Sequence, residues 1–279
     1  MGVVNYCLEN TLMDTSKIKM VVFDIDGTLI AERENKIQAS AVTAIHALHN
    51  KGFKVLVATG RAPYFIKPHV FEVIDSDYYV TINGQCVMNR QHEIISRHDL
   101  NKTDIQQLLT LCQKENVALG CKCSNQIVVL HDYDRFVEYY GHGEQPNGRF
   151  LDSTKSIDIL DNDMAMGLFL VGDVQKIIDH KDEFPQWTFS RAFSWGLDIF
   201  DKDVHKSKGI EDVLEILGLS WEEVMVFGDA DNDLRMIEKA GIGIAMGNGT
   251  ENLKKIADYV TSDLDKDGIY NGLKHFKLI

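Results

Sequence analysis

The chain has 279 residues, of which 44% are hydrophobic and 25% are charged, and its formal net charge is −13. This length exceeds the needs of one compact core and suits two domains. The acidic balance argues against a nucleic-acid-binding protein, which needs a basic surface. No apolar run approaches the roughly 20 residues that span a bilayer. We therefore expect a globular protein with no nucleic-acid or membrane partner.

Residues 1–19 are polar and lack the apolar core of a signal peptide, so we interpret them as an N-terminal extension. The five cysteines are an odd number in a chain too large to depend on disulfide bonds. Cys121 and Cys123 have no second pair or nearby histidine to complete a metal site, and we expect buried thiols. These features predict a cytoplasmic location.

The first third of the chain alternates between apolar runs and helical periodicity. This pattern predicts a strand over 20–23, a helix over 40–51, a strand over 55–58, a helix over 64–74 and a strand over 78–81. Such βαβ units imply a parallel sheet with helices on both faces.

The residues that follow have an alternation of their own. It predicts a helix over 103–115, strands over 117–122 and 126–130, a helix over 132–140, a strand over 165–171, a helix over 173–184, and strands over 187–191 and 194–200. The turn-rich segment 141–148 predicts a surface loop. Residues 85–195 are therefore expected to form an inserted α/β domain.

After the insert, the chain returns to the strand–helix alternation of its first third. We predict a helix over 207–217, a strand over 224–227, a helix over 232–240, a strand over 242–245 and a helix over 250–257. The expected fold class is therefore α/β, with one Rossmann-like parallel-sheet core built from residues 20–84 and 196–279.

Two carboxylates, Asp24 and Asp26, directly follow the first predicted strand, and Gly27 and Thr28 then turn the chain. Open α/β sheets place their chemistry at the carboxyl ends of strands. Two acids so close together repel each other unless a cation or a bound proton offsets their charge. Taken alone, the pattern fits an ordinary turn equally well. A calcium loop does not fit, because Asn35 stands where such a loop has glutamate.

Three further segments supply complementary groups. Thr59, Gly60 and Arg61 follow the second predicted strand and offer a hydroxyl, a close backbone approach and a planar cation. Residues 228–233, Gly-Asp-Ala-Asp-Asn-Asp, follow the strand at 224–227 with more acids. Residues 204–209, Val-His-Lys-Ser-Lys-Gly, place an ammonium just ahead of a helix. Together these groups describe a metal-assisted phosphoryl-transfer site.

On these residues the chain resembles the haloacid dehalogenase-like (HAD) phosphatase superfamily. Its four motifs correspond in order to Asp24-x-Asp26-Gly-Thr-Leu, Thr59, Lys206 and Gly228-Asp229-x-x-Asn232-Asp233. The long insert and residues 81–84 and 243–248 resemble the Cof-type branch (subclass IIB, with a C2-type cap). The resemblance implies that residues 85–195 form a substrate-specificity cap that closes over the core and excludes water.

The resemblance also implies a Mg²⁺-dependent phosphatase that works through an aspartyl-phosphate intermediate. Asp24 would be the nucleophile, and Asp26 the general acid and then the general base. Asp24, the main-chain carbonyl of Asp26 and Asp229 would hold Mg²⁺.

Phosphate binding is implied for Thr59 and Lys206, helped by the backbone at Gly60. Asn232 would contact the phosphate, while Asp233 would orient Lys206 or a metal-bound water. The site would therefore combine carboxylates with phosphate-binding groups.

Three assignments stay open. Lys208 competes with Lys206 for the phosphate, although motif context favours Lys206. Arg61 is equally compatible with a substrate contact and with an ion pair that braces its loop. Asn83 is a candidate for the cleft mouth, although Asn-Gly is also simply a good turn.

The family's substrates suggest a small phosphorylated metabolite, such as a sugar phosphate, flavin mononucleotide or pyridoxal phosphate. Tyr139, Tyr140 and His142 are candidate cap contacts, although aromatic residues at this spacing more often serve packing. One alternative is a phosphomutase of the same superfamily. Another is a non-catalytic phosphometabolite sensor, which would have no need of Asp26 as a proton donor. The sequence is compatible with a monomer and with a homodimer.

Overall fold

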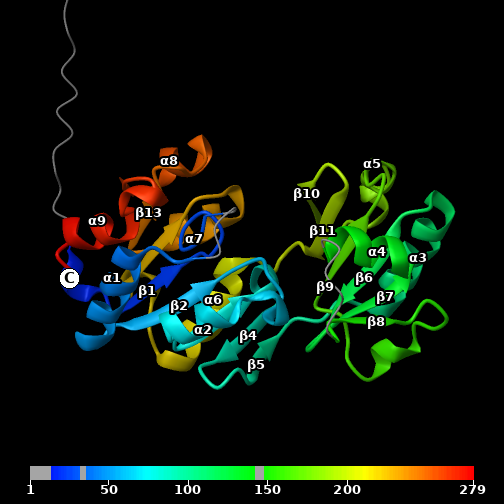
Figure 1. The fold of residues 1–279 in the computed structure, drawn as a ribbon, viewed down its shortest axis with the longest axis horizontal. Helices are drawn as coiled ribbons and strands as arrows, with labels where there is room; N and C mark the ends of the chain where they lie inside the picture. Colours follow the sequence, from blue (N-terminus) through cyan, green and yellow to red (C-terminus); the bar gives the residue numbers. More distant parts are fainter. Residues whose placement is uncertain (1–13, 32–35, 142–147) are drawn as a thin grey trace, which may run out of the picture.

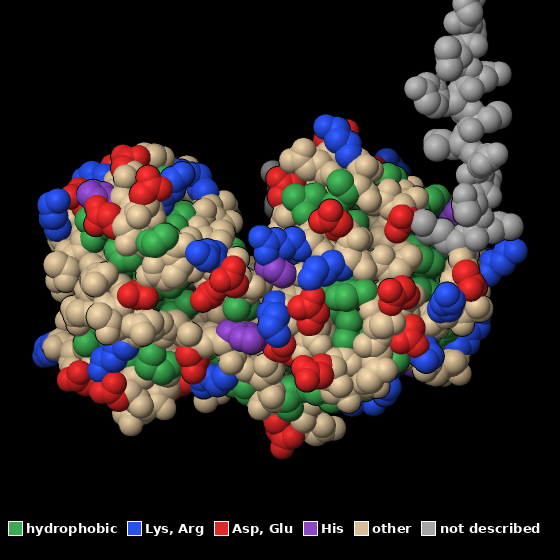
Figure 2. All heavy atoms as spheres, turned by 180° about the vertical axis from the view of Figure 1, so that it is seen from behind, with side chains coloured by type: hydrophobic (Ala, Val, Ile, Leu, Met, Phe, Trp, Pro, Cys, Tyr) green, Lys and Arg blue, Asp and Glu red, His purple; other side chains and the backbone are tan. Residues whose placement is uncertain are grey.

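The computed structural model describes residues 14–31, 36–141 and 148–279 (Figure 1). Most of the expected N-terminal extension, the centre of the expected loop at 141–148, and Asn35 and His142 lie outside the described residues. The described residues form two lobes, drawn as a ribbon in Figure 1 and as atomic spheres in Figure 2. On the face in Figure 2, acidic and basic side chains are mixed over both lobes.

The first lobe is built on an eight-stranded sheet with the order β14-β13-β12-β1-β2-β3-β4-β5. The bounds are β1 Met20–Phe23, β2 Lys54–Ala58, β3 Tyr78–Thr81, β4 Cys86–Asn89, β5 Ile94–Arg97, β12 Val224–Gly228, β13 Ile242–Ala245 and β14 Tyr259–Val260. Strand β1 lies centrally and pairs parallel with β12 and β2, with Met20 opposite Val224 and Lys54. Every residue of β1 is buried, as its unbroken apolar run predicts for a strand covered on both faces.

Helices cover both faces of this sheet. Their bounds are α1 Ala39–Asn50, α2 Pro68–Ile74, α6 Lys206–Leu217, α7 Leu234–Lys239, α8 Glu251–Ile256 and α9 Gly268–His275. Val21 and Phe23 pack with buried side chains of α1, α2 and α9. Met20 and Val22 point the other way and pack with α6, α7 and α8. The alternation of side chains along β1 therefore divides the core into two layers.

The second lobe contains a six-stranded sheet with the order β10-β11-β9-β6-β7-β8. The bounds are β6 Ala118–Lys122, β7 Ile127–His131, β8 Phe150–Asp152, β9 Gly167–Val171, β10 Trp187–Phe193 and β11 Gly196–Asp201, with α3 Lys102–Glu115, α4 Tyr133–Tyr140 and α5 Gln175–Ile178. Helices α3 and α5 pack on one face and α4 on the other. The predicted buried thiols are confirmed, since Cys121 and Cys123 are buried and free.

The predicted domain boundaries at 84/85 and 195/196 do not match the sheets. Strands β4 and β5 continue the first sheet, because β4 folds back antiparallel on β3. Strand β11 belongs to the second sheet, where it pairs with β9 and β10. The chain therefore leaves the first sheet after Arg97 and the second after Asp201. A strand's own residues do not reveal the sheet in which it pairs.

Two predicted helices are shorter than expected. The helix over 64–74 begins only at Pro68, because proline favours the first helical position and holds Lys67 in an extended conformation. The helix over 173–184 is reduced to α5 and a 3₁₀ turn at Lys181–Glu183. Its charged run at 179–183 offers no apolar face to pack, and short helices need such packing.

Among the residues described, no helix has the length and apolar character needed to cross a membrane.

Candidate active site

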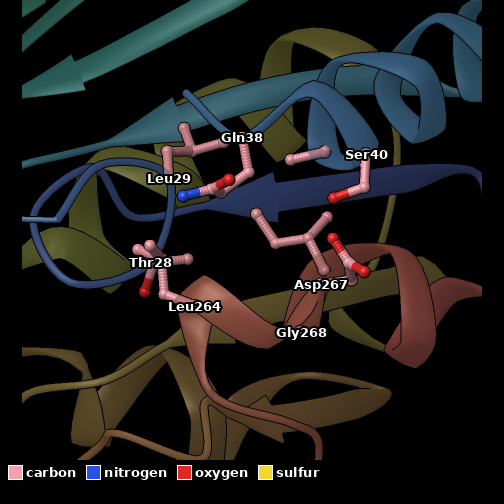
Figure 3. A pocket seen from close by; sticks show the side chains of 9 residues that line it. Thr28, Leu29, Gln38, Ser40, Leu264, Asp267 and Gly268 are labelled. Atoms are coloured by element: carbon pink, nitrogen blue, oxygen red, sulfur yellow. The ribbon is translucent and has the colours of Figure 1, made fainter. Parts of the chain in front are cut away.

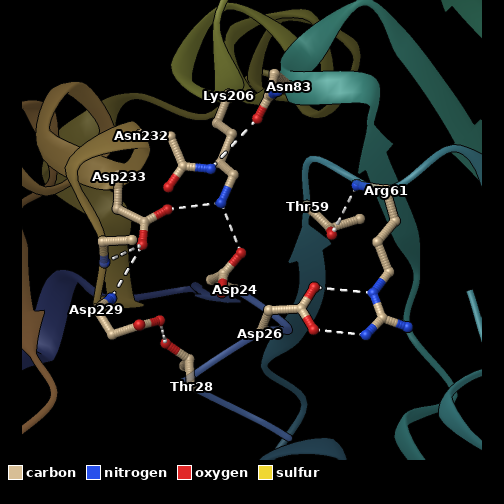
Figure 4. Close-up of polar contacts among 11 residues, drawn as sticks. Asp24, Asp26, Thr28, Thr59, Arg61, Asn83, Lys206, Asp229, Asn232 and Asp233 are labelled. Carbon is tan, nitrogen blue, oxygen red and sulfur yellow. Dashed lines mark hydrogen bonds and ion pairs between the residues drawn. The ribbon is translucent and has the colours of Figure 1, made fainter. Parts of the chain in front are cut away.

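The carboxyl ends of β1, β2 and β12 meet at one edge of the first sheet, because these strands are adjacent and parallel. Asp24, Thr59 and Asp229 directly follow those three strands. Lys206, the first residue of α6, reaches the same edge from a distant part of the chain (Figure 4). The structure therefore gathers the residues of all four motifs.

Lys206 is buried and bridges two carboxylates. Its Nζ donates to Asp24 Oδ1 at 2.6 Å and to Asp233 Oδ1 at 2.7 Å. Burial lowers the pKa of Lys206, but Asp233 and then Asp24 more than offset this effect, so the pKa is raised. Lys208 instead pairs with Asp212, one helical turn further on, and its side chain is 38% exposed. Of the two candidate lysines, Lys206 is therefore the one that contacts the acids.

Asp24, Asp229 and Asp233 form an acidic cluster, with a carboxylate oxygen from each within 4.8 Å of the others. Burial is the main cause that raises the pKa of Asp24 well above its usual value and that of Asp229 to about 6. One ammonium, that of Lys206, faces these three carboxylates. Their excess negative charge and oxygen donors fit a hard divalent cation such as Mg²⁺.

Asp233 also stabilises the loop that follows β12. Its Oδ2 accepts hydrogen bonds from the backbone N–H groups of Asp229 and Ala230 at 2.9 and 3.1 Å. One carboxylate thus fixes the turn after β12 and holds Lys206. This contact fits the expectation that Asp233 orients Lys206.

The turn after Asp26 supports Asp229 through contacts that the sequence did not predict. Thr28 Oγ1 donates to Asp229 Oδ1 at 2.9 Å, and Asn248 Nδ2 donates to the Gly27 carbonyl at 2.8 Å. Gly27 has a φ of +90°, and a Cβ there would lie 2.1 Å from Asp229 Oδ2. Only glycine fits this close approach. The sequence signal available for Thr28 was its hydroxyl group, two residues after Asp26.

Asp26 points away from the acidic cluster and pairs with Arg61 (Figure 4). Arg61 Nε and Nη2 donate to the two carboxylate oxygens at 2.8 and 2.5 Å, and Nη1 donates to the Phe65 carbonyl at 3.3 Å. Of the two interpretations of Arg61, the structure contains the bracing ion pair. The Asp26 side chain is 41% exposed, so this pair lies at the open side of the site.

Asn83 joins the ends of three strands. It follows β3 with a φ of +53°, and its Oδ1 accepts from Asn232 Nδ2 at 3.3 Å. A Cβ on Gly60 would lie 3.0 Å from the same Oδ1. Asn83, Gly60 and the exposed Asn232 therefore lie together, beside Thr59, whose Oγ1 accepts from the Arg61 N–H at 3.1 Å.

A narrow crevice with essentially no room for a water molecule lies on the far side of the Thr28 turn, between the start of α1 and α9 (Figure 3). Ligand sites for small molecules have volumes of about 300–1,000 Å³. This crevice is too small for a metabolite, and the acidic cluster does not line it.

We expect the metal-free protein to lose stability as the pH rises from about 4 to about 6. The pKa of Asp229 is raised from 3.8 to about 6 in the folded state, so folding favours its protonated form. This contribution is present at low pH and is lost as the carboxyl ionises. Urea unfolding of wild type and Asp229→Asn in chelator measures this contribution. The free energy of unfolding of wild type should fall relative to that of the variant across this pH range, and Mg²⁺ should reverse the fall. Parallel curves in chelator would contradict the assignment.

A family model of haloacid dehalogenase-like hydrolases matches residues 21–273. The chain belongs to the haloacid dehalogenase-like hydrolases. YkrA of Bacillus subtilis strain 168 is 29% identical over 267 residues, which cover 94% of this chain and 98% of that protein. The 5-amino-6-(5-phospho-D-ribitylamino)uracil phosphatase YcsE of the same organism is 24% identical and covers 94% and 96% of the two chains.

A solved structure of a HAD subclass IIB sugar phosphatase has a TM-score of 0.78 and 28% identity, covering 94% of this chain and 100% of its own. A protein from Geobacillus kaustophilus HTA426 has a TM-score of 0.83, also with 28% identity and the same coverage. The expected α/β fold, membership of the Cof-type branch and the prediction of a phosphatase are confirmed.

Proposed function

We propose that this HAD hydrolase is a cytoplasmic, Mg²⁺-dependent phosphatase of small phosphorylated metabolites that works through an aspartyl-phosphate on Asp24. The observation that carries the proposal is the acidic cluster at the sheet edge, bridged by buried Lys206. The free buried cysteines are compatible with the reducing cytoplasm. Relatives that act on a phosphorylated ribityl compound and on sugar phosphates support the substrate class.

Asp24 is the proposed nucleophile, and its carboxylate must be ionised to attack phosphorus. Burial opposes ionisation, whereas the Lys206 ammonium at 2.6 Å favours it. Asp24, Asp229 and the Asp26 carbonyl would hold Mg²⁺, which when bound neutralises carboxylate and phosphoryl charge. Lys206 and Thr59 then stabilise the transferring phosphoryl oxygens, since preorganised donors act strongly in a buried site.

Asp26 is the proposed general acid and base. Its carboxyl gives a proton to the departing alkoxide oxygen as the Asp24–phosphorus bond forms. The resulting carboxylate then takes a proton from the water that attacks the aspartyl-phosphate, which restores Asp24 and releases phosphate. Arg61 holds Asp26 through both oxygens, so Asp26 must leave this pair to carry a proton. Arg61 is then free to bind an anion.

Asp26→Asn should therefore separate the two steps. With p-nitrophenyl phosphate the leaving group needs little protonation, so Asp24 is still phosphorylated, whereas hydrolysis of the intermediate lacks its base. We expect a burst of p-nitrophenolate stoichiometric with enzyme and a steady rate about 10²- to 10⁴-fold below wild type. Rapid-mixing absorbance measures both phases. Wild-type steady turnover in the variant would exclude Asp26 as the base.

The proposal as a whole is tested by phosphate release from a panel of phosphate monoesters, with Mg²⁺ and with chelator. Turnover that requires Mg²⁺ supports the phosphatase. Transfer of a phosphoryl group to the substrate after addition of an activating bisphosphate, without release of phosphate, would indicate the phosphomutase. Tight binding of a phosphate ester without turnover, by folded protein with Mg²⁺, would indicate the sensor. Gel filtration would separate the monomer from the homodimer.

A further inference from the structure

A second buried lysine lies in the inserted lobe, outside the motifs. Lys122 is the last residue of β6, and its side chain is 3% exposed. Its ammonium pairs with Asp198 of β11 and lies 5.6 Å from the centre of the Phe169 ring. Burial lowers the pKa of Lys122, but Asp198 more than offsets this effect and the pKa is raised. The group is therefore a buried cation.

Buried charges are costly and need several hydrogen-bond partners. An ammonium has three protons, and among the described residues Asp198 is the hydrogen-bond partner found for this one. A second polar group nearby is also unsatisfied, since the Tyr64 hydroxyl is buried and has no partner in the described part of the chain. Burial is the main cause that raises the pKa of Tyr64. Two buried polar groups with spare hydrogen-bonding capacity in one region can bind a polar ligand.

This region lies between the inserted lobe and the catalytic edge. The Phe65 ring, four residues beyond Arg61, packs edge-on against Tyr140 of α4 with centroids 5.3 Å apart. A Cβ on Gly167, which pairs with Lys122 in the second sheet, would lie 2.9 Å from Ile82 Cγ2, beside Asn83. The polar groups therefore lie on the side of the lobe that contacts the site.

Tyr140 links the two sets of charges. Burial raises its pKa, and the charges of Lys122 and Asp198 also act on it. Arg61, which holds Asp26, acts on the same hydroxyl. The Tyr140 ring lies 4.5 Å from that of Phe169. Contacts therefore run from Asp26 to Arg61 and on to Phe65. From there they continue through the rings of Tyr140 and Phe169 to the Lys122 ammonium.

We propose that Lys122 and Asp198, with the hydroxyls of Tyr64 and Tyr140, bind the leaving group and select an uncharged polyhydroxy compound, as in a sugar or sugar-alcohol phosphate. This inference rests on the proposed phosphatase function. A hydroxyl group accepts from Lys122 and donates to Asp198, so it satisfies both members of the pair. A second anionic group would meet the Asp198 carboxylate. A plain aromatic leaving group makes none of these hydrogen bonds and therefore gains no affinity from the pair.

The decisive variant is Lys122→Met/Asp198→Asn, which removes both charges and so leaves neither buried alone. We expect kcat/KM for ribose 5-phosphate and glucose 6-phosphate to fall by about 10- to 100-fold, as for lost hydrogen bonds to charged groups. The value for p-nitrophenyl phosphate should stay within about threefold of wild type, because that substrate makes none of these contacts. The matched control is Lys102→Met/Asp161→Asn, an exposed ion pair of the same lobe, which should leave both values unchanged.

Equal losses with both kinds of substrate, or no loss with either, would overturn the proposal. A wild-type preference for fructose 1,6-bisphosphate or 3-phosphoglycerate over uncharged leaving groups would also overturn it. If wild type hydrolyses no ester, the phosphatase function fails separately. Thermal unfolding then still tests the subsite: ribose 5-phosphate should raise the Tm of wild type beyond the effect of inorganic phosphate, and the double variant should lack that additional increase.

Discussion

Asp24→Asn is expected to reduce kcat by about 10⁴-fold or more, because removal of a nucleophile leaves only binding and electrostatic catalysis. The fold should remain intact. Asparagine is close to aspartate in shape, and burial already disfavours the Asp24 charge. Lys206 keeps its contact with Asp233. We therefore expect the Tm of the metal-free variant to equal or exceed that of wild type, measured beside phosphate release.

Asp231→Asn is the matched control for this experiment. Asp231 lies in the loop after β12 but is exposed, and its Oδ1 accepts from Thr250 Oγ1 at 2.8 Å. Its substitution should change kcat less than about threefold. Wild-type kcat in Asp24→Asn, or equal losses in both variants, would refute the role of Asp24.

Lys206→Met should have the largest effect on stability. Its ammonium is the buried partner of Asp24 and Asp233, and loss of one partner from a buried ion pair costs about 3–5 kcal/mol. The loss should be larger at neutral pH than at pH values near 5, because protonated carboxyls need no cation. Urea unfolding at both pH values measures the difference. Turnover should also fall, since the transferring phosphoryl group loses its ammonium.

Lys208→Met provides the comparison, since Lys208 lies on the same helix, its side chain is 38% exposed, and it pairs with Asp212 four residues further on. Such pairs contribute about 0.3–0.5 kcal/mol, so stability and turnover should change little. A larger loss in Lys208→Met than in Lys206→Met would reverse the assignment of the phosphate-binding lysine.

The sequence predicted which residues meet at this sheet edge, because they adjoin short apolar runs that form strands. Asp24 and Asp229 each follow a run typical of a buried strand, and adjacent parallel strands bring such positions together. The choice of Lys206 over Lys208 depended on motif context, and the helix places Lys206 at its first, buried position.

The remaining features depend on contacts between distant segments. The Asp26–Arg61 ion pair joins two loops that are distant in the sequence. The sequence alone therefore could not decide whether Arg61 contacts substrate or forms an ion pair. Lys122 and Asp198 are 76 positions apart on strands that are not neighbours in the sheet. A charged residue at a strand end usually predicts solvent exposure, and only the folded chain shows that Lys122 is buried. The two sheets change over at residues other than the predicted boundaries for a similar reason, since strand pairing is not encoded locally.

The most direct test of the central claim is chemical trapping of the intermediate. Asp26→Asn, turning over p-nitrophenyl phosphate with Mg²⁺, is quenched in acid and reduced with borohydride, which converts an aspartyl-phosphate to homoserine. Peptide mass spectrometry then locates the modified residue. We predict homoserine at position 24, dependent on substrate and on Mg²⁺. Steady phosphate release by wild type with an unmodified Asp24 in the trapped variant, or modification at another residue, would contradict the mechanism.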